Sequence, residues 1–387
     1  MKKWLVFPLL LGVIATGAYF AVPAAKNFLK ENKTEIIVRS VDAFRNVSKL
    51  LPIEEDKKER IDVLADLTDY VLRKDGRTRR YLLLLQNNME LRPGGGFLGQ
   101  YAIVKVKDGE VVGFFVEDAN LLDQRITAKV RPPWPLTRYL RIKRWKLRDS
   151  NFSPDFPTNV AKAEYFLRLG GVGGKFDGVA AINATVLNEA LKITGPITVR
   201  GVTFDSKDAV LTLEEAVGKN YLGDDVDPAA KQARKNIMKE MARELLARLA
   251  KPSQIKAVSD LAFAELDNKD IQLFFRDENL QKKIDAVGWS GRLDDSWDGD
   301  FLMVVDANLG ALKSDYFVKR RLEHKVDFTV EGAPLAESWV YYNHTAKYGD
   351  WRTSDWHGWN RMIVPTGSEY LDRVKTGGVQ TLELKKF

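Results

Sequence analysis

The stretch that most constrains the fold is Tyr81–Gln86, with the sequence YLLLLQ. Four consecutive leucines make both faces of an extended chain apolar, so a strand here has to be covered on both sides. Such a strand belongs in the middle of a sheet that lies between layers of helices. Strand-like and helix-like segments alternate from residue 81 to about residue 310. The sequence therefore predicts an α/β fold, a three-layer α/β/α sandwich with a mixed sheet.

Local signals place several elements within this domain. The Asp108-Gly109 pair between Gly99–Val106 and Val111–Val116 predicts a β-hairpin. A helix is expected over residues 159–169, ending at a Gly-Gly pair. Phe301–Asp306 is expected as a late strand of the same domain. After Ser314 the pattern alternates as in strands and four tryptophans cluster, which predicts a small β-rich C-terminal domain.

The N-terminal segment predicts a membrane anchor. Trp4–Ala25 contains no charged residue and is about long enough to cross a bilayer as a helix. The alternative is a cleaved signal peptide, since Val22-Pro23-Ala24 resembles a small-residue cleavage site. The short head before the apolar stretch favours a single-pass protein of the cell membrane with its bulk extracytoplasmic. The expected regions are 1-25 transmembrane anchor, 26-78 helical stalk or packing helices, 79-314 α/β/α domain, and 315-387 β-rich domain, which need not be complete at residue 387.

Composition excludes several classes of function. The chain has no cysteine, which excludes disulfides, thiol catalysis and cysteine-bound metals. Its net charge of +7 favours anionic surroundings such as phosphate-rich polymers or acidic lipid head groups. The sequence has no P-loop, no dinucleotide-binding glycine fingerprint and no serine nucleophile elbow. No nucleic-acid reader motif is visible, so nucleic acid is not an expected partner.

The first candidate site follows the buried strand. Asn88 and Arg92 come just before three consecutive glycines, Gly94, Gly95 and Gly96. Backbone N–H groups of a glycine loop can converge on an anion, and an arginine can add a bidentate contact to phosphate. The alternative is that Arg92 pairs with Glu90 and the glycines only turn the chain.

Two further patches carry candidate ligands. Arg148 and Asp149 lie before a helix, and Asp118 ends a strand; such carboxylates beside a phosphate site could hold Mg²⁺, or could cap turns instead. The third patch begins a later helix with Lys231, Arg234 and Lys235. A helix N-terminus attracts anions, although such a run is also typical of a solvated face.

Several motifs, found in the same order, resemble a known family. The segments are YLLLLQNNMELRPGGGF, RDSNFSPDFP, FDGVAAINATVLNEALKITGPITV and DANLGALKSDYFVKR. From about Arg79 to Phe387 the chain resembles the bacterial family labelled domain of unknown function 4012. More distantly, it resembles the LytR–CpsA–Psr phosphotransferases, single-pass envelope proteins that transfer glycopolymers from a polyprenyl-pyrophosphate carrier to peptidoglycan.

The distant resemblance implies roles for particular residues. Arg92 takes the place of the arginine after the first strand and Arg234 that of the helix arginines, while Asp118 and Arg148 are further pocket members. Two departures bear on the metal: Pro93 and the three glycines stand where those enzymes have a Mg²⁺-binding aspartate, and Glu117-Asp118 replaces an arginine–aspartate pair. The protein is expected to bind a polyprenyl-(pyro)phosphate-linked glycopolymer and, if it is an active enzyme, to transfer it. Arg92, Arg148 and Arg234 would then stabilise the phosphates. The alternative is a non-enzymatic surface scaffold or glycan-binding protein.

Overall fold

The computed structural model describes residues 45–46, 49, 52–218, 237, 240–245, 247–249, 251, 254–294, 296–297, 299–310, 312–347, 355–369 and 371. The expected anchor at 1–25 and the basic helix start with Lys231, Arg234 and Lys235 lie outside these residues. In the part of the chain that is described, no helix has the length and apolarity needed to span a membrane.

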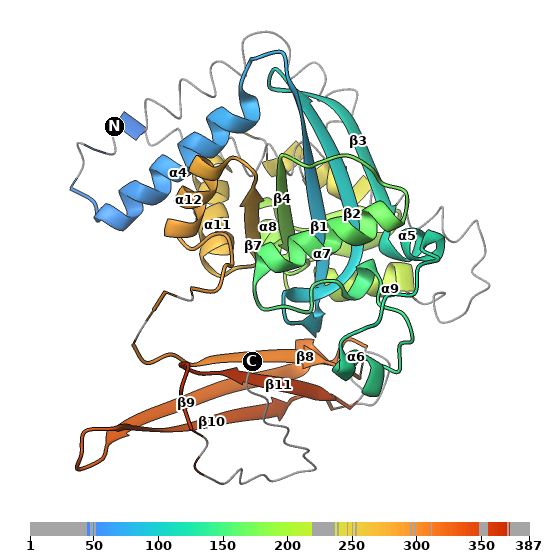
Figure 1. Cartoon of the computed structure of the whole chain (residues 1–387). Coiled ribbons are helices and arrows are strands. Elements are labelled where there is room, and N and C mark those ends of the chain that lie inside the picture. The colour runs from blue at the N-terminus through green and yellow to red at the C-terminus, as the bar shows by residue number, and fades with distance from the viewer. Residues whose placement is uncertain are drawn as a thin grey trace.

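The described helices and strands alternate along the chain (Figure 1). In order they are α4 (Glu55–Leu72), β1 (Thr78–Arg92), β2 (Gly95–Lys107), β3 (Glu110–Asp118), α5 (Ala119–Arg125), α6 (Trp134–Arg138), η1 (Leu147–Asp149), α7 (Phe156–Leu169), β4 (Gly178–Asn183), α8 (Val186–Thr194), β5 (Ile197–Val199), β6 (Val202–Phe204), α9 (Ala209–Gly218), α11 (Ile255–Asp267), β7 (Ile271–Phe275), α12 (Glu278–Ala286), β8 (Met303–Asn308), η3 (Ser314–Phe317), β9 (Val318–Phe328), β10 (Pro334–His344) and β11 (Gly358–Ile363).

The core of the protein is a mixed five-stranded sheet, in the order β3-β2-β1-β4-β7. The central strand β1 is antiparallel to β2 and parallel to β4. β3 and β7 close the two edges, each antiparallel to its neighbour. The expected α/β class with a mixed sheet is confirmed, and the strand of four leucines is at its centre.

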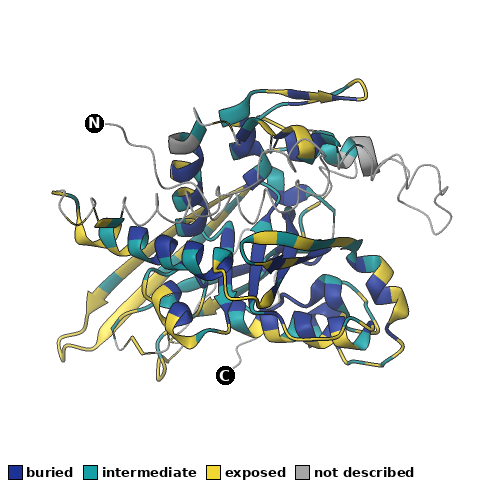
Figure 2. Cartoon of the chain, turned by 90° about the horizontal axis from the view of Figure 1, so that it is seen from above, coloured by how far each residue is buried: buried dark blue, intermediate teal, exposed yellow. Residues whose placement is uncertain are grey.

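Helices cover both faces of this sheet, because β1 is apolar on both. Leu82 and Leu84 point into a core shared with α5 and α7. Tyr81 and Leu83 point into the opposite core, which α4, α11 and α12 complete. The inner strands β1 and β4 are accordingly mostly dark blue in Figure 2. The helix α4 therefore packs on the sheet as a layer.

The expected local signals account for the hairpin and for α7. Asp108 and Gly109 have φ of 51° and 77°, the left-handed pair that a tight hairpin turn requires. The α7 helix starts where the Asp155 carboxylate accepts the backbone N–H of Thr158 at 2.9 Å. It ends at Gly170, one residue before a glycine at φ 85°.

The C-terminal region forms two separate strand pairs. β9 pairs with β10 in an antiparallel ribbon, as the alternating pattern predicts. β8 pairs with β11 and has no partner in the five-stranded sheet. The strand at 301–306, expected as part of the α/β domain, thus belongs with the C-terminal strands. Figure 1 shows these strands below the end of β1 at which Arg92 lies.

Candidate functional site

Arg92, the first residue predicted to bind phosphate, is buried at the end of β1 and only 2% exposed. Its Nε donates to Asp149 Oδ1 at 3.0 Å, its Nη2 to Glu90 Oε1 at 2.9 Å, and its Nη1 to the carbonyl of Asn308 at 2.9 Å. Burial acts to lower the pKa of Arg92, but the Asp149 and Glu90 carboxylates outweigh it and hold that pKa above its ordinary value. An exposed phosphate contact by Arg92 is therefore not supported, and the alternative pairing with Glu90 is confirmed.

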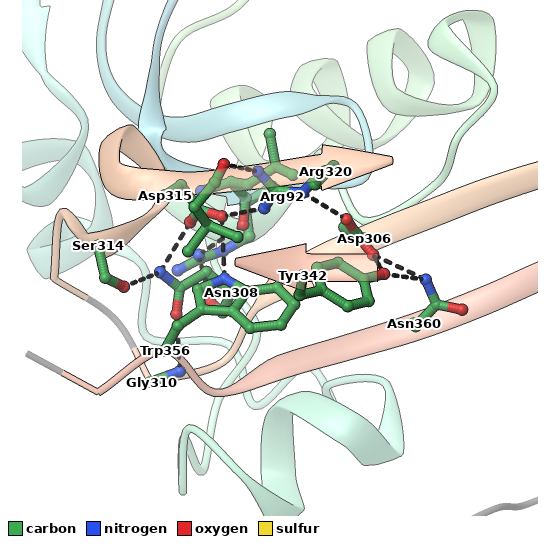
Figure 3. A network of polar contacts seen from close by, with 12 residues as sticks. Arg92, Asp306, Asn308, Gly310, Ser314, Asp315, Arg320, Tyr342, Trp356 and Asn360 are labelled. Atoms are coloured by element: carbon green, nitrogen blue, oxygen red, sulfur yellow. Dashed lines mark hydrogen bonds and ion pairs between the residues drawn. The ribbon is translucent and has the colours of Figure 1, made fainter. Parts of the chain in front are cut away.

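A second polar cluster continues from Arg92 into the C-terminal strands (Figure 3). Asp315 accepts the backbone N–H of Leu91 at 3.0 Å, Asn308 Nδ2 at 2.7 Å and Trp356 Nε1 at 3.0 Å, and it also pairs with Arg320. Asp315, Asn308 and Arg320 all lie in the segment DANLGALKSDYFVKR, but Leu91 lies on β1 and Trp356 lies just before β11. The cluster acts as a latch that joins the end of β1 to the C-terminal strands.

Asp306 extends the same latch. It accepts Arg320 Nε, the Tyr342 hydroxyl and Asn360 Nδ2, each at 2.7 Å. Burial acts to lower the pKa of Arg320, but the charges of Asp315 and Asp306 outweigh this effect, so the pKa lies above its ordinary value. Two arginines and several carboxylates thus neutralise one another inside the protein.

The glycines expected to cradle an anion are packed against the neighbouring chain. A Cβ at Gly94 would meet Asn159 Nδ2 at 2.3 Å, and one at Gly96 would meet the backbone carbon of Asn87 at 2.3 Å. Gly95 has φ +126°, and a Cβ there would lie 2.1 Å from Gln86 Oε1. These positions therefore require glycine for close packing, which accounts for the triplet without a ligand.

The remaining described site residues also have structural partners. Arg148 Nε donates to the buried Asp123 carboxylate at 2.9 Å. Asp118 caps α5 by accepting the backbone N–H of Asn120 at 2.8 Å. No group of three or more metal-ligating side chains capable of holding a metal ion occurs among the described residues. With Asp149 bound to Arg92 and Asp118 serving as a cap, these two carboxylates do not fit the expected Mg²⁺ site.

The structure also reveals a polar cluster at the end of β4, beside Asn88 of β1. Asn88 Nδ2 donates to Thr185 Oγ1 at 2.8 Å, and Asn183 Nδ2 donates to Asp270 Oδ1 at 2.9 Å. Parallel strands bring their carboxyl ends to one edge of a sheet, where α/β proteins commonly bind ligands. Of these residues, sequence reasoning singled out only Asn88. Asn183 could have been found from its place at the end of the predicted strand that runs through 176–182.

Glu265 lies near this edge and is 4% exposed. Burial raises its pKa to about 7, and the negative charges of Asp270 and Glu189 add to the effect. Glu265 Oε2 has no hydrogen-bond partner among the described residues. This carboxyl group therefore titrates near neutral pH.

One face of the β9–β10 ribbon displays aromatic side chains to solvent. Trp339 and Tyr341 are 43% and 41% exposed, and being two residues apart on one strand they point to the same side. Arg321, paired with Tyr341 across the ribbon, has its guanidinium carbon 4.1 Å from the centre of that ring. The Tyr341 hydroxyl donates to Glu323 Oε2 at 3.1 Å. We call Arg321, Glu323, Trp339 and Tyr341 the aromatic face.

Comparisons with known proteins show what part of the chain is similar to. A search of curated proteins found no match. Two solved structures are similar at 12% identity: the Lin1025 protein of Listeria innocua, covering 56% of this chain and 80% of its own with a TM-score of 0.29, and the Lmo1026 protein of Listeria monocytogenes (fragment 52–321), covering 68% and 90% with a TM-score of 0.30. Residues 76–217, which contain the sheet strands β1 to β4, match the model of the family described as "Protein of unknown function (DUF4012)". This segment of the chain is therefore similar to the DUF4012 family.

Proposed function

We propose that this chain is a membrane-anchored, extracytoplasmic envelope protein that binds a glycopolymer through the aromatic face and does not transfer it. In this proposal the α/β unit is a three-layer sandwich of the LytR–CpsA–Psr type whose catalytic site has been replaced by structural contacts. It serves as a rigid platform for the C-terminal strands.

The observation that carries the proposal is the exposure of Trp339 and Tyr341 on the same side of one strand. The negative π-face of an aromatic ring attracts the C–H groups of a sugar ring that lies flat on it. Exposed apolar side chains rimmed by polar ones are typical of interaction sites. Arg321 and Glu323 supply such a rim beside Tyr341.

The contacts of Arg92 and Arg148 support a binding role over a transferase role. Phosphoryl transfer is catalysed by positive groups aimed at the charge that develops on the phosphate. All three guanidinium nitrogens of Arg92 already donate to protein oxygens, and Arg148 is paired with Asp123. Redirecting Arg92 to a phosphate would leave Asp149 buried without its partner and Glu90 with only Lys313, which is unfavourable.

The polyprenyl-phosphate carrier is a separate question within this proposal. Its binding would rest on Lys231, Arg234 and Lys235, without help from Arg92. In a transferase, Arg92 and Arg148 would be expected to stabilise the phosphate together with Arg234. Because both are already paired, Lys231, Arg234 and Lys235 would have to supply most of the positive charge. This requirement makes the glycan-binding role the simpler proposal.

Calorimetric titration of the detergent-solubilised full chain with purified envelope glycopolymer fractions tests the proposal. Replacement of both aromatic residues (W339A/Y341A) should weaken binding at least tenfold, because two stacking surfaces are removed. Phe328 is a matched control, since it is 71% exposed on the same ribbon but its position in the strand places it on the opposite face. Equal binding by wild type, W339A/Y341A and F328A would refute the proposed site.

A further inference from the structure

The positive charge of this chain is concentrated in the segment 124–148, which connects α5 to η1. These 25 residues contain nine Lys and Arg and no Asp or Glu. The whole chain has a net charge of +7, so the remainder carries −2, the difference between +7 and +9. The segment therefore accounts for the basic character of the entire protein.

Three of the nine cations are used inside the fold. Arg125 makes a bidentate pair with Glu117. Lys146 donates to the carbonyl of Asp123 at 2.5 Å, and Arg148 pairs with the carboxylate of the same residue. These contacts fix the two ends of the segment.

The other six cations are exposed, and we call their segment, 129–144, the basic crossover. Arg138 stacks on Tyr139, with 5.5 Å from its guanidinium carbon to the ring centre. The other five make no hydrogen bond or ion pair with any residue that the structure describes; they are Lys129, Arg131, Arg141, Lys143 and Arg144. Like charges within one 16-residue segment repel one another, and none of these five is paired with a described carboxylate.

The fold does not require these charges, because the other side of the crossover does the packing. Leu136 is buried with Phe152 and Leu309, and Leu140, Ile142 and Trp145 pack against the same cluster. Backbone hydrogen bonds hold the shape, with Tyr139 N–H to Pro135 O at 2.9 Å and Trp145 N–H to Val130 O at 2.8 Å. The cations are thus presented from a fixed backbone, which reduces the entropy that a ligand would otherwise have to overcome.

We propose that the basic crossover binds a linear polymer that carries repeated phosphate groups. Four of the six exposed cations are arginines, whose planar forks pair with phosphate in a bidentate way. Several cations spread over one segment suit a ligand with several charges more than a single small anion. The crossover is distinct from the aromatic face, so this inference does not rest on the proposed function.

Two observations favour a polymer over a lipid surface. Tyr139, 39% exposed, is the only exposed large apolar or aromatic side chain of the crossover, whereas membrane-surface segments usually insert several apolar groups. In Figure 1, α6 lies beside the C-terminal strands, far from α4. A proposed anchor joined to the N-terminal side of α4 would not by itself bring the crossover to the bilayer.

Fluorescence anisotropy with end-labelled inorganic polyphosphate tests the proposal on the detergent-solubilised full chain. The variant R141Q/K143Q/R144Q removes three of the five cations without described partners. The control K107Q/K175Q/K282Q removes the same net charge from three exposed lysines scattered over the α/β unit. We expect the crossover variant to bind at least tenfold more weakly at 50 mM salt, and the control to stay within twofold of wild type. The slope of log Kd against log salt should fall by about 2 to 3 in the crossover variant.

Three results would overturn the inference. Failure of the wild type to bind polyphosphate even at low salt would be the first. Equal weakening of both triple variants would mean that net charge alone, rather than the crossover, is responsible. Binding to anionic lipid vesicles that depends on the crossover and that polyphosphate does not compete with would identify a membrane surface as the partner.

Discussion

Arg92 Nη1 donates to the carbonyl oxygen of Asn308 at 2.9 Å, although the two residues are 216 positions apart in the chain. The contact joins the end of the central strand β1 to β8, which pairs with the C-terminal strand β11. Together with the bond from Leu91 N–H to Asp315, it makes the C-terminal strands an extension of the α/β unit. The arginine that sequence patterns connect with phosphate is thus a structural residue here.

Removal of Arg92 should therefore destabilise the protein strongly. The R92A variant leaves Asp149 buried without its partner and Glu90 with only Lys313, 3.2 Å away. Losing one member of a buried ion pair typically costs about 3–5 kcal/mol. Urea unfolding of R92A should show a loss of that size, while R144A should change stability by less than about 0.5 kcal/mol because Arg144 is exposed. An R92A protein as stable as wild type would contradict the structural role assigned to Arg92 in joining β1 to the C-terminal strands.

Substitution of Gly95 should be far more damaging than substitution of Gly99 on the same strand. In G95A the new Cβ would lie 2.1 Å from Gln86 Oε1 on a backbone with φ +126°. Backbone strain of this kind alone costs about 1–3 kcal/mol. A Cβ at Gly99 would meet nothing within 4 Å. Thermal unfolding should show a clear drop in Tm for G95A and a small change for G99A; similar values for both would argue against the packed glycine loop.

Glu265 should make stability fall as the pH rises from about 4.5 to about 7. Its carboxyl has an ordinary pKa of 4.5 in the unfolded chain and about 7 in the folded protein. Over that interval the folded state holds a proton that the unfolded state has lost, so raising the pH favours unfolding, by up to about 3 kcal/mol in total. The E265Q variant should lose this decline and be more stable than wild type at pH 8. Exposed Glu331, replaced in E331Q, is the control, and an unchanged pH profile in E265Q would exclude this assignment.

Asp315 should control how firmly the C-terminal strands are held. In D315A the Asn308 amide, the Trp356 indole and Arg320 all lose an acceptor. Limited trypsin digestion should then cut β9 faster than in wild type, whereas D300A, which removes only an exposed partner of His324, should not. Equal digestion of the two variants would mean that other contacts carry the attachment.

Local sequence patterns correctly predicted the elements that are determined by residues close together in the chain. The apolar strand at 81–86, the Asp108-Gly109 hairpin and the end of α7 at Gly170 depend on neighbouring residues, and all three are present. The partner of β8 could not be predicted in this way, because the strand at 303–308 reads as one more step of the α/β alternation. Its pairing with β11 depends on residues 50 to 60 positions later, from Asn308 with Gly358 to Met303 with Ile363.

The site was harder to predict for the same reason. Arginine followed by a glycine triplet fits an anion loop and a packed structural turn equally well. The choice between them depends on Asp149 and Asn308, which are 57 and 216 positions from Arg92. The titration of Glu265 likewise depends on burial and on Asp270 and Glu189, which no local pattern reveals.

The most direct test of the account is a transfer assay on the purified full chain. The protein is incubated with a radiolabelled polyprenyl-pyrophosphate-linked glycopolymer and with peptidoglycan as acceptor, with and without Mg²⁺. We predict that polymer is retained by wild type, lost by W339A/Y341A and recovered intact in every case, with no release of polyprenyl phosphate. Mg²⁺-dependent release that R234A abolishes would show that the protein is a transferase and would contradict the account.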